Sequence, residues 1–575
     1  MTKETKKKRG RAPANGAELI VDFFERNGVD LVFGYPGGAV IPLYDALHDG
    51  NAKHVLARHE QGAAHAADGF ARASGRTGVV IATSGPGATN LVTGLANAHM
   101  DSVPLVAITG QVNTSSLGTD GFQEADIYGI SIPITKYNYL VKNPADLEDV
   151  LAEAFFLAGT GRPGPVLIDV PRDIQTAPAK SNGKKTVSIP GYDPRPVPDD
   201  GEVEALAGAI SRSRRPVFYV GGGASGEGVS ETLLKLAEDS DIAVVSTLQA
   251  KGVFPDDREL SLGLPGMHGA KYANLAINES DLIIGLGVRF DDRVVGDVRG
   301  FAPLARVAHV DVDPAEIGKR VSVDIPVAGD LKLVLDRLAK TIKPSKKPAW
   351  RERLARLKSE HPLIVPESRG NLIKPQAAIR ALSEATGGEA IIVTDVGQHQ
   401  MWAAQFVTST KPRRFLSSGG LGTMGFGLPA SVGAALSGTG LPVALVSGDG
   451  SFQMTLQELA TVRQYDIPVK ILIIDNGCLG MVRQWQEFFF DKRYSQTVFE
   501  YNPDFSALAK VYGIPGKRVE NPADLTDSVR ELLETPGPGL LDVVCDGGEN
   551  VLPMIPAGKG QTDFYEAEEN PPRPS

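Results

Sequence analysis

The chain has 575 residues, enough for three to four domains of ordinary size. Its formal net charge of −10 argues against general binding to nucleic acid, and no apolar run approaches the length that crosses a membrane. Two cysteines, Cys478 and Cys545, argue against a disulfide scaffold and suit the reducing cytoplasm, where we expect the protein to act.

The first eleven residues are rich in lysine and arginine. They could form a nucleic-acid-binding arm or part of a transit peptide, but the stretch is short and lacks the Ser-rich amphipathic pattern of transit peptides. No apolar segment typical of a signal peptide follows the lysines. We therefore expect residues 1–16 to be a solvated, disordered basic tail.

A carboxylate marks the start of a predicted helix in the first domain, residues 17–180. Glu60 follows a short predicted strand, and small residues from 63 to 71 indicate that its helix is tightly packed. Glu60 alone is explained as an acidic residue in the first turn, where the helix dipole favours it. A catalytic role becomes the better interpretation only if the chain also binds a cofactor that needs a carboxyl group.

Two segments rich in proline and charge divide the chain into three parts. Residues 176–200 and 343–374 have few apolar side chains and are predicted to be surface linkers. After the first domain they leave a central domain at 200–342, a third domain at 373–558 and a C-terminal tail at 559–575.

The first and third domains share a repeated pattern. Residues 143–149 (NPADLED) and 521–527 (NPADLTD) each begin a predicted helix, with proline early and acidic residues in the first turn. Each helix is followed by a similar predicted strand, at residues 163–170 and 536–543. One seven-residue segment could match by chance. A chance match is less plausible when a helix start and a strand are repeated in the same order. We expect the same fold twice, as open parallel sheets wrapped by helices.

The central domain also alternates predicted strands and helices. Strands are expected at residues 216–220, 242–246, 281–286 and 305–312. A glycine-rich stretch at 221–226 follows the first strand and fits the GxGxxG pattern of dinucleotide-binding turns. No single acidic residue stands out at the ribose-binding spacing, so a plain strand-to-helix turn explains these glycines equally well.

The most informative motif lies in the third domain, where Asp449 and Asn476 each follow an apolar run, at 441–446 and 469–474. We expect these runs to be neighbouring buried strands that deliver both side chains to one end of the sheet. Glycines around Asp449 allow a tight turn that aims backbone N–H groups at the same point. A carboxylate, an amide oxygen and backbone carbonyls suit an octahedral Mg²⁺ that carries a diphosphate. GDG alone is common, but GDG with Asn at this spacing resembles the thiamine diphosphate signature.

Further motifs resemble the catalytic subunit of the acetohydroxyacid (acetolactate) synthase family. They are residues 35–39 (YPGGA), 58–62 (RHEQG), 118–126 (GTDGFQEAD), 419–425 (GGLGTMG), 479–485 (LGMVRQW) and 551–556 (VLPMIP). The resemblance extends from residue 17 to residue 558. It implies an α/β protein of three open parallel-sheet domains, which bind the pyrimidine, FAD and the diphosphate in that order. It also implies thiamine diphosphate, Mg²⁺ and FAD as cofactors.

The resemblance implies catalytic roles for four residues. Glu60 would bond to the N1′ atom of the aminopyrimidine and favour the tautomer that removes the thiazolium C2 proton. Met424 would lie under the cofactor and impose its bent conformation. Gln123 and Gly38 would lie over the thiazolium.

It also implies which residues hold the cofactors. Mg²⁺ would be ligated by Asp449, Asn476 and the backbone carbonyl of Cys478. Thiamine diphosphate would contact residues of the third domain, namely Gly397, Gln398, His399, Gly422, Gly450, Ser451 and Met481. FAD, which takes no part in the net reaction, would contact strand ends of the central domain and one residue of the first: Arg162, Gly221, Gly222, Gly223, Thr247, Leu248, Met267, His268, Gly287, Arg289, Asp311 and Asp330.

The implied acceptor pocket is formed by Phe122, Arg172, Arg293, Val482 and Trp485. Trp485, with Met481 and Val482, would favour the ethyl group of 2-ketobutyrate over the methyl group of pyruvate, a difference of about 1–3 kcal/mol. Arg293 would hold the acceptor carboxylate, a task that suits a guanidinium. Without the resemblance, an interface or core aromatic is the better interpretation of Trp485.

Three positions depart from the family pattern. Asp475 stands where the signature usually has the first of two asparagines and adds a charge beside the expected metal. Arg172 replaces a common lysine, so the charge is kept but the geometry changes. Asn113 replaces a proline at the mouth of the family's herbicide-binding channel, and we therefore expect tolerance of sulfonylureas.

The implied reaction decarboxylates pyruvate and ligates the two-carbon unit to a second 2-ketoacid. Pyruvate as acceptor gives 2-acetolactate, and 2-ketobutyrate gives 2-aceto-2-hydroxybutyrate, the precursors of valine, leucine and isoleucine. We expect a homodimer or homotetramer, because a two-fold axis can combine the Glu60 and GDG domains of two chains. A separate regulatory small subunit is also expected, whereas nucleic acid and membrane partners are not.

Other enzymes of the same fold remain alternatives, namely catabolic acetolactate synthase, glyoxylate carboligase and pyruvate oxidase. Glu60 disfavours glyoxylate carboligase, which lacks this carboxylate, and residues 483–485 (RQW) favour the anabolic synthase. A non-catalytic subunit of this fold would be predicted to lack Glu60, Asp449 or Asn476, and all three are present.

Overall fold

The computed structural model describes residues 12–183, 186–368 and 370–565. The chain divides into two compact units, the first Met1–Ala71 with Gly75–Tyr192 and the second Arg72–Ser74 with Asp193–Ser575. Most of the predicted basic tail, residues 1–16, lies outside the described residues.

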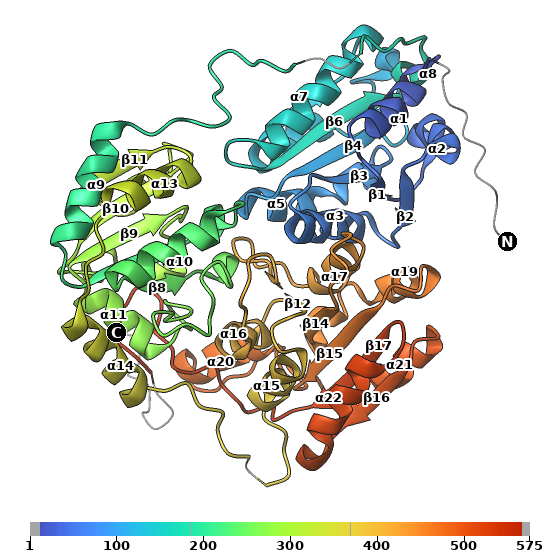
Figure 1. Cartoon of the computed structure of the whole chain (residues 1–575). Helices are drawn as coiled ribbons and strands as arrows, with labels where there is room; N and C mark the ends of the chain where they lie inside the picture. The colour runs from blue at the N-terminus through green and yellow to red at the C-terminus, as the bar shows by residue number, and fades with distance from the viewer. Residues whose placement is uncertain (1–11, 184–185, 369, 566–575) are drawn as a thin grey trace. The chain divides into compact units, whose positions relative to one another are not determined.

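The first unit contains a six-stranded sheet of order β2-β1-β3-β4-β6-β5, parallel throughout (Figure 1). Its strands are β1 (Leu31–Gly34), β2 (Lys53–Leu56), β3 (Gly78–Ala82), β4 (Leu105–Gln111), β5 (Tyr137–Leu140) and β6 (Pro165–Pro171). Its helices are α1 (Gly16–Arg26), α2 (Ile41–Asp49), α3 (Glu60–Ser74), α4 (Pro86–Thr89), α5 (Val92–Met100), α6 (Ile127–Ser131), α7 (Leu147–Gly159) and α8 (Arg172–Thr176). The central strands are buried along their whole length, as expected where helices cover both faces of a parallel sheet.

The second unit holds two sheets. The central sheet has the order β11-β10-β9-β7-β8, with β7 (Pro216–Val220), β8 (Ala243–Ser246), β9 (Leu282–Leu286), β10 (Arg306–Asp311) and β11 (Ile325–Ala328). Its helices are α9 (Asp200–Arg212), α10 (Val229–Ser240), α11 (Lys271–Glu279), α12 (Asp292–Val295), α13 (Leu331–Thr341) and α14 (Pro348–Glu360). The four strands predicted for this domain are confirmed.

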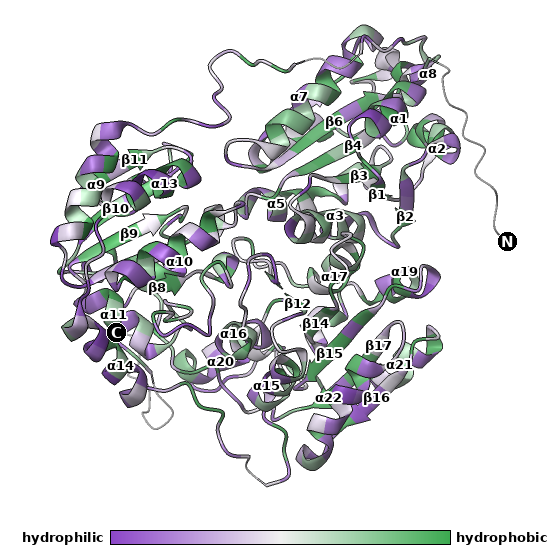
Figure 2. Ribbon diagram, viewed as in Figure 1, coloured by the Kyte–Doolittle hydropathy of each residue, from purple (hydrophilic) through white to green (hydrophobic). Residues whose placement is uncertain are grey.

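The other sheet of the second unit has the order β13-β12-β14-β15-β17-β16. Its strands are β12 (Ile391–Thr394), β13 (Phe415–Leu416), β14 (Val443–Gly448), β15 (Val469–Asp475), β16 (Gly516–Val519) and β17 (Gly539–Val544). Its helices are α15 (Pro375–Thr386), α16 (Gln398–Phe406), α17 (Gly427–Ala435), α18 (Asp449–Phe452), α19 (Leu459–Gln464), α20 (Gly480–Phe489), α21 (Phe505–Val511) and α22 (Leu525–Glu534). Figure 2 shows that β15 is largely hydrophobic, that the edge strand β16 carries hydrophilic residues, and that the surrounding helices carry both kinds.

The predicted repeat is confirmed by the two six-stranded sheets, because numbering the strands of each in chain order gives the same order, 2-1-3-4-6-5. The repeated NPAD sequence has the same local structure in both copies. Asn143 accepts a hydrogen bond from the backbone N–H of Ala145 at 3.2 Å, and Asn521 accepts one from Ala523 at 3.1 Å. Each asparagine thereby caps a short 3₁₀ turn that leads into α7 or α22.

Two expectations about linkers and tails were wrong. The segment 343–374 contains α14, because Trp350, Leu354 and Leu357 share one helical face and pack into the central core. The segment after residue 558 is not a free tail as far as residue 565. Gln561 is buried and donates to the carbonyl of Val294, and Tyr565 pairs with Met554.

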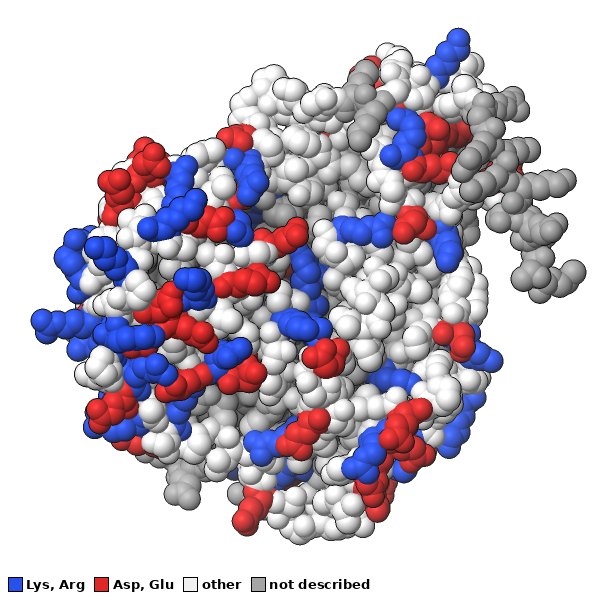
Figure 3. Space-filling view, viewed as in Figure 1, with Lys and Arg blue, Asp and Glu red and all other residues white. Residues whose placement is uncertain are grey.

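The surface seen in Figure 3 carries lysine and arginine side chains interspersed with aspartate and glutamate. This mixture is densest over the central domain, where α9, α10 and α14 lie in Figure 1. Within the described residues, none of the helices has both the length and the hydropathy to cross a membrane.

Candidate active site

Asp449 lies at the carboxyl end of β14 and begins α18. Its Oδ2 accepts hydrogen bonds from the Gly477 N–H at 2.9 Å and from the Asn502 side-chain amide at 2.8 Å. Its Oδ1 accepts the Gly450 N–H at 2.9 Å. The pKa of Asp449 is raised well above its usual range, mainly by burial and to a smaller extent by the nearby Asp475. A divalent cation beside this carboxylate would favour the charged form, so the site fits a metal ligand.

Asn476 follows β15, which pairs in parallel with β14 through Ser447–Ile473 and Gly448–Ile474. Asp449 and Asn476 therefore lie at the same edge of the sheet, as predicted. The Asn476 Oδ1 accepts the Cys478 N–H at 3.2 Å, and its Nδ2 donates to Gln398 Oε1 at 3.4 Å. This arrangement places a carboxylate and an amide oxygen at one edge of the sheet, which suits a hard cation.

Cys478 lies in the same turn with a buried side chain. Burial raises the pKa of the Cys478 thiol to about 11, so the sulfur stays protonated near neutral pH. A protonated thiol is a poor ligand for Mg²⁺, and the Cys478 backbone carbonyl is the better candidate.

His399, in the first turn of α16, is packed against the glycines expected to line the diphosphate. A Cβ at Gly448 would lie 2.7 Å from His399 Nδ1, and a Cβ at Gly397 would lie 3.0 Å from Cε1. Burial lowers the pKa of His399 to about 3, which makes the ring neutral. Its buried Nε2 has no hydrogen-bond partner among the described residues, and a diphosphate oxygen would supply one.

The loop that carries Gly422 and Met424 is held by a residue that sequence reasoning missed. Asp395, directly after β12, accepts the Gly425 N–H at 2.8 Å and the Ser447 hydroxyl at 3.3 Å. Asp395 is fully buried, and burial raises its pKa to about 6. Its position after a buried strand was the only available signal, and nothing in the sequence indicated which loop it would hold.

Gly450 and Ser451 connect the Asp449 turn to the end of β12. The Ser451 hydroxyl donates to the Val396 carbonyl at 2.7 Å. A Cβ at Gly450 would lie 2.8 Å from Leu479 Cδ2, so a larger residue would require the Leu479 side chain to move. These contacts bring residues 396–399, 449–451 and 476–479 to one place.

Helix α20 carries the residues expected to shape the acceptor pocket. Met481 and Trp485 are one helical turn apart, and Val482 beside them is 51% exposed. Gln484 is fully buried and forms two hydrogen bonds with the backbone of Val551. Its Oε1 accepts the Val551 N–H at 2.8 Å, and its Nε2 donates to the Val551 carbonyl at 3.1 Å. The helix is thus fixed from one side while Val482 faces outward. Trp485 itself is partly exposed and packs on Phe489 with ring centroids 5.3 Å apart, so it is not a core residue.

Arg293 and Met267 of the central domain lie beside residues 551–555, the segment whose Val551 bonds to Gln484 of α20. The Met267 N–H donates to the Arg293 carbonyl at 2.7 Å, and the Ile555 N–H donates to the Met267 carbonyl at 2.8 Å. His268 is buried, and its pKa is lowered to about 4, mainly by burial and to a smaller extent by the charge of Arg293. Residues 551–555 therefore contact both Gln484, next to Trp485, and the Met267–Arg293 pair.

The glycines predicted to bind FAD interlock at the carboxyl edge of the central sheet. The Gly223 N–H donates to the Gly287 carbonyl at 3.1 Å, and a Cβ at Gly221 would lie 2.2 Å from that oxygen. Close packing of two backbones thus explains Gly221 without a ligand. Gly222, Thr247, Leu248, Arg289 and Asp311 lie at the same strand ends. Asp330 caps α13 and pairs with Arg195 at 3.0 Å, so its carboxylate already has partners.

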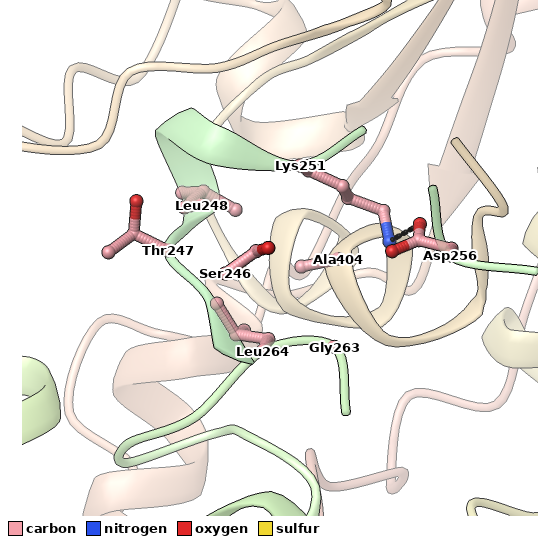
Figure 4. A pocket seen from close by; sticks show the side chains of 8 residues that line it. All are labelled: Ser246, Thr247, Leu248, Lys251, Asp256, Gly263, Leu264 and Ala404. Atoms are coloured by element: carbon pink, nitrogen blue, oxygen red, sulfur yellow. Dashed lines mark hydrogen bonds and ion pairs between the residues drawn. The ribbon is translucent and has the colours of Figure 1, made fainter. Parts of the chain in front are cut away.

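A small cavity of about 10 Å³ adjoins this edge (Figure 4). It is lined by Ser246, Thr247, Leu248, Lys251, Asp256, Gly263, Leu264 and Ala404. Lys251 and Asp256 form an ion pair at 2.7 Å in its wall. The cavity is roughly the size of one water molecule and is not a flavin-binding cleft.

Glu60 lies in the first unit, where β2 leads into α3. The carboxyl is buried, and its Oε2 accepts the Asn90 side-chain amide at 2.9 Å. Asn90 was missed because it lies 30 residues from Glu60 in the sequence, a separation that gives no spacing signal. A Cβ at Gly87 would lie 3.2 Å from Glu60 Oε1, so this glycine leaves room beside the carboxyl.

The loop with Phe122 and Gln123 approaches the same region of the first unit. Gln123 has a positive φ of 58°, and its carbonyl oxygen would lie 2.7 Å from a Cβ at Gly85, two residues before Gly87. Phe122 is 89% exposed. Gly38 begins a 3₁₀ turn and has open space where a Cβ would stand.

Two further predicted residues of the first unit are Arg162 and Arg172. Arg162 donates to the Ser102 hydroxyl at 2.9 Å, and Arg172 is exposed at the start of α8. Their assigned contacts with FAD and substrate stay predictions.

Comparison with known proteins places these sites in a family. Family models of the thiamine pyrophosphate enzymes match the N-terminal TPP binding domain at residues 14–130, the central domain at 203–338 and the C-terminal TPP binding domain at 395–543. The chain is 48% identical to the acetolactate synthase large subunit of Corynebacterium glutamicum, over 98% of this chain and 93% of that protein. The chain belongs to the acetolactate synthase family of thiamine pyrophosphate enzymes.

Other members of the acetolactate synthase family are similar over the same extent. The probable large subunit of Methanocaldococcus jannaschii is 48% identical, over 96% of this chain and 95% of that protein. The chloroplastic acetolactate synthase of Arabidopsis thaliana is 48% identical, over 95% of this chain and 83% of that protein. The resemblance, the fold class and the use of thiamine diphosphate are thereby confirmed, while the residue roles and domain boundaries stay predictions.

Proposed function

We propose that the chain is the catalytic subunit that joins two 2-ketoacids with loss of CO₂. Pyruvate is the donor. Pyruvate as acceptor gives 2-acetolactate, and 2-ketobutyrate gives 2-aceto-2-hydroxybutyrate. The observation that carries the proposal is the joint position of Asp449 and Asn476 at the edge of β14 and β15, in a chain of the acetolactate synthase family.

Asp449, Asn476 and the Cys478 carbonyl would hold Mg²⁺, and the turns at 397–399 and 450–451 would hold the diphosphate. The buried carboxylate and the unpartnered His399 Nε2 support this placement. The chemistry that thiamine diphosphate supplies when bound is a nucleophilic carbon and an electron sink for decarboxylation.

Glu60 would hold a proton at the pyrimidine N1′ atom. The hydrogen bond from Asn90 fixes its carboxyl, and its burial excludes water that would otherwise compete for the proton. Met424 would shape the floor of the site, since Asp395 holds the Gly425 N–H at the end of its loop.

The acceptor would be selected by α20 and held by Arg293. Trp485 and Val482 offer apolar surface that an ethyl group fills better than a methyl group, worth about 1–3 kcal/mol. The Arg293 guanidinium would pair with the acceptor carboxylate. FAD would lie along the strand ends at Gly221–Gly223 and Gly287 and take no part in the net reaction.

We further propose that two copies of the chain assemble, as a homodimer or homotetramer, so that Glu60 of one chain and Asp449 of another complete a site. Two of the relatives named above are called large subunits, which supports a separate small subunit as a regulatory partner. We expect the enzyme to act in the cytoplasm.

Product analysis with purified protein tests the proposal. With pyruvate, thiamine diphosphate, Mg²⁺ and FAD, the expected product is 2-acetolactate, formed with one CO₂ for two pyruvates consumed. Activity should disappear on removal of Mg²⁺ with a chelator and return when Mg²⁺ is restored. Acetate or peroxide as the product would instead support an oxidase of the same fold.

A further inference from the structure

Asp475 is the departure from the family signature that the proposed reaction does not explain. It is the last residue of β15, next to the expected metal ligand Asn476, and its side chain is 6% exposed. Its Oδ1 accepts a hydrogen bond from the Asn502 amide at 2.7 Å, and its Oδ2 lies 3.3 Å from an Arg518 nitrogen. Both carboxylate oxygens therefore already have partners within the protein.

Asn502 bridges Asp475 and Asp449. Its Nδ2 donates to Asp475 Oδ1 at 2.7 Å and to Asp449 Oδ2 at 2.8 Å, which uses both amide hydrogens. Its Oδ1 accepts from the Gln453 amide at 3.1 Å. The opposite amide orientation would place a carbonyl oxygen against two carboxylates, so the network fixes the orientation shown.

Arg518 offsets the charge of Asp475 on the side away from Asn502. It also pairs at 2.7 Å with Asp542, a side chain that is fully buried. A buried carboxylate is tolerated when it is paired and hydrogen-bonded, and Asp475 meets both conditions. Because Arg518 is shared with Asp542 and Glu520, it offsets part of the extra negative charge beside the metal site.

These hydrogen bonds leave one carboxylate oxygen of Asp449 able to bind a ligand. Oδ2 accepts two N–H groups, from Gly477 and Asn502, and this fills its two lone pairs. Among the described residues, Oδ1 accepts only the Gly450 N–H. Oδ1 therefore retains acceptor capacity for a ligand.

We propose that Asn502 is a positioning residue that orients Asp449 toward the metal, and that Asp475 anchors Asn502 and does not itself bind the metal. The inference rests on the proposed metal site. Groups that orient a metal ligand typically change metal affinity by about 10- to 100-fold when they are removed.

The test measures Mn²⁺ binding to the full chain by electron paramagnetic resonance, with saturating thiamine diphosphate and FAD. Asn502→Leu keeps the side-chain size and removes both donors, and should weaken Mn²⁺ binding about ten-fold or more. Asp475→Ala should weaken Mn²⁺ binding by a similar factor. The double variant should bind Mn²⁺ no more weakly than Asn502→Leu alone, because both changes interrupt the same hydrogen-bond chain from Asp475 through Asn502 to Asp449. Asp475→Asn keeps an acceptor for Asn502 and should stay within about three-fold of the unmodified chain.

Asn521→Leu is the matched control, because it removes an asparagine hydrogen bond that caps the turn before α22 and touches no residue of the metal site. It should leave Mn²⁺ affinity unchanged. Raising Mg²⁺ should restore turnover in Asn502→Leu, which a general folding defect would not allow. Thermal unfolding of each variant identifies any that fails to fold. If Asn502→Leu fails, the pair Asp475→Ala and Asp475→Asn decides: weaker Mn²⁺ binding in the first but not in the second supports the anchoring role, and equal affinities contradict it.

Three results would overturn the inference. An unchanged Mn²⁺ affinity in Asn502→Leu would remove the positioning role. A loss in Asp475→Asn as large as in Asp475→Ala would make Asp475 a direct metal partner. If the unmodified chain binds no Mn²⁺ with thiamine diphosphate present, the proposed metal site fails as well, and that result is distinct from the first two.

Discussion

Asp395 accepts a hydrogen bond from the backbone N–H of Gly425 at 2.8 Å, so a buried carboxylate after β12 holds the loop that presents Met424. The pair joins two segments 30 residues apart that the proposed cofactor site needs together. It gives that loop a fixed position before any ligand binds.

Asp395→Ala should therefore weaken thiamine diphosphate binding about ten-fold or more, because the loop loses a charge-assisted hydrogen bond and the buried N–H loses its partner. Titration of intrinsic fluorescence with thiamine diphosphate measures the change. Asp199→Ala is the control, since Asp199 accepts the Glu202 N–H at 3.1 Å to cap α9 in the central domain. Equal affinities for Asp395→Ala and the unmodified chain would show that the loop does not depend on Asp395.

Glu60→Gln should lose most turnover, on the order of 100-fold or more, while still binding thiamine diphosphate. The amide is nearly the same shape but cannot exchange a proton at the pyrimidine. Steady-state rates and a binding titration on the same preparation separate the two effects. Glu18→Gln is the control, because Glu18 lies in the first turn of α1, where its N–H donates to the capping Asn15. Activity near that of the unmodified chain would contradict the assigned role of Glu60.

Trp485→Leu should reduce the preference for 2-ketobutyrate over pyruvate as acceptor by about ten-fold, because the pocket loses apolar surface. The ratio of the two acetohydroxyacids formed from mixed substrates measures this directly. Both products come from one reaction mixture, so a general loss of activity cancels in the ratio. An unchanged ratio would assign the selection to another residue.

Asn113→Pro should make the enzyme more sensitive to chlorsulfuron. Asn113 has φ −58° and ψ 148°, a conformation that proline adopts readily, so the substitution should not disturb the loop. The inhibition constant should be weaker than nanomolar in the unmodified chain and fall in the variant. A nanomolar constant for the unmodified chain would refute the expected tolerance.

Asp169 should make stability depend on pH. It is buried between Thr109, at 2.8 Å, and Gln111, at 3.0 Å, and burial raises its pKa from 3.8 to about 7. The folded state therefore holds this proton more tightly than the unfolded state. The stabilisation is complete below about pH 4 and is lost as the pH rises through 7.

Asp169→Asn removes this titration. The free energy of unfolding of the variant, relative to the unmodified chain, should therefore rise by about 1–4 kcal/mol between pH 4 and pH 8. Thermal unfolding of both proteins across this range measures the difference. A difference that does not change with pH would contradict the raised pKa.

Most of the fold followed from local patterns. Buried parallel strands form continuous apolar runs, and so β14, β15 and the four named strands of the central sheet were predicted from the sequence. Helix α14 was missed, because only Trp350, Leu354 and Leu357 mark its buried face among many charged residues.

The site was predictable only where its residues lie in motifs. Asp449 and Asn476 follow two neighbouring strands, and their spacing identified them. Asp395, Asn502 and Asn90 act through partners 27 to 53 residues away, such as Gly425, Asp475 and Asp449. Such contacts are created by the fold and leave no local pattern.

The most direct test of the account is a competition assay with the purified chain, thiamine diphosphate, Mg²⁺ and FAD. Pyruvate and 2-ketobutyrate are supplied in equal amounts, and both acetohydroxyacids are quantified. The account predicts an excess of 2-aceto-2-hydroxybutyrate over 2-acetolactate. Acetolactate alone, or neither product, would contradict it.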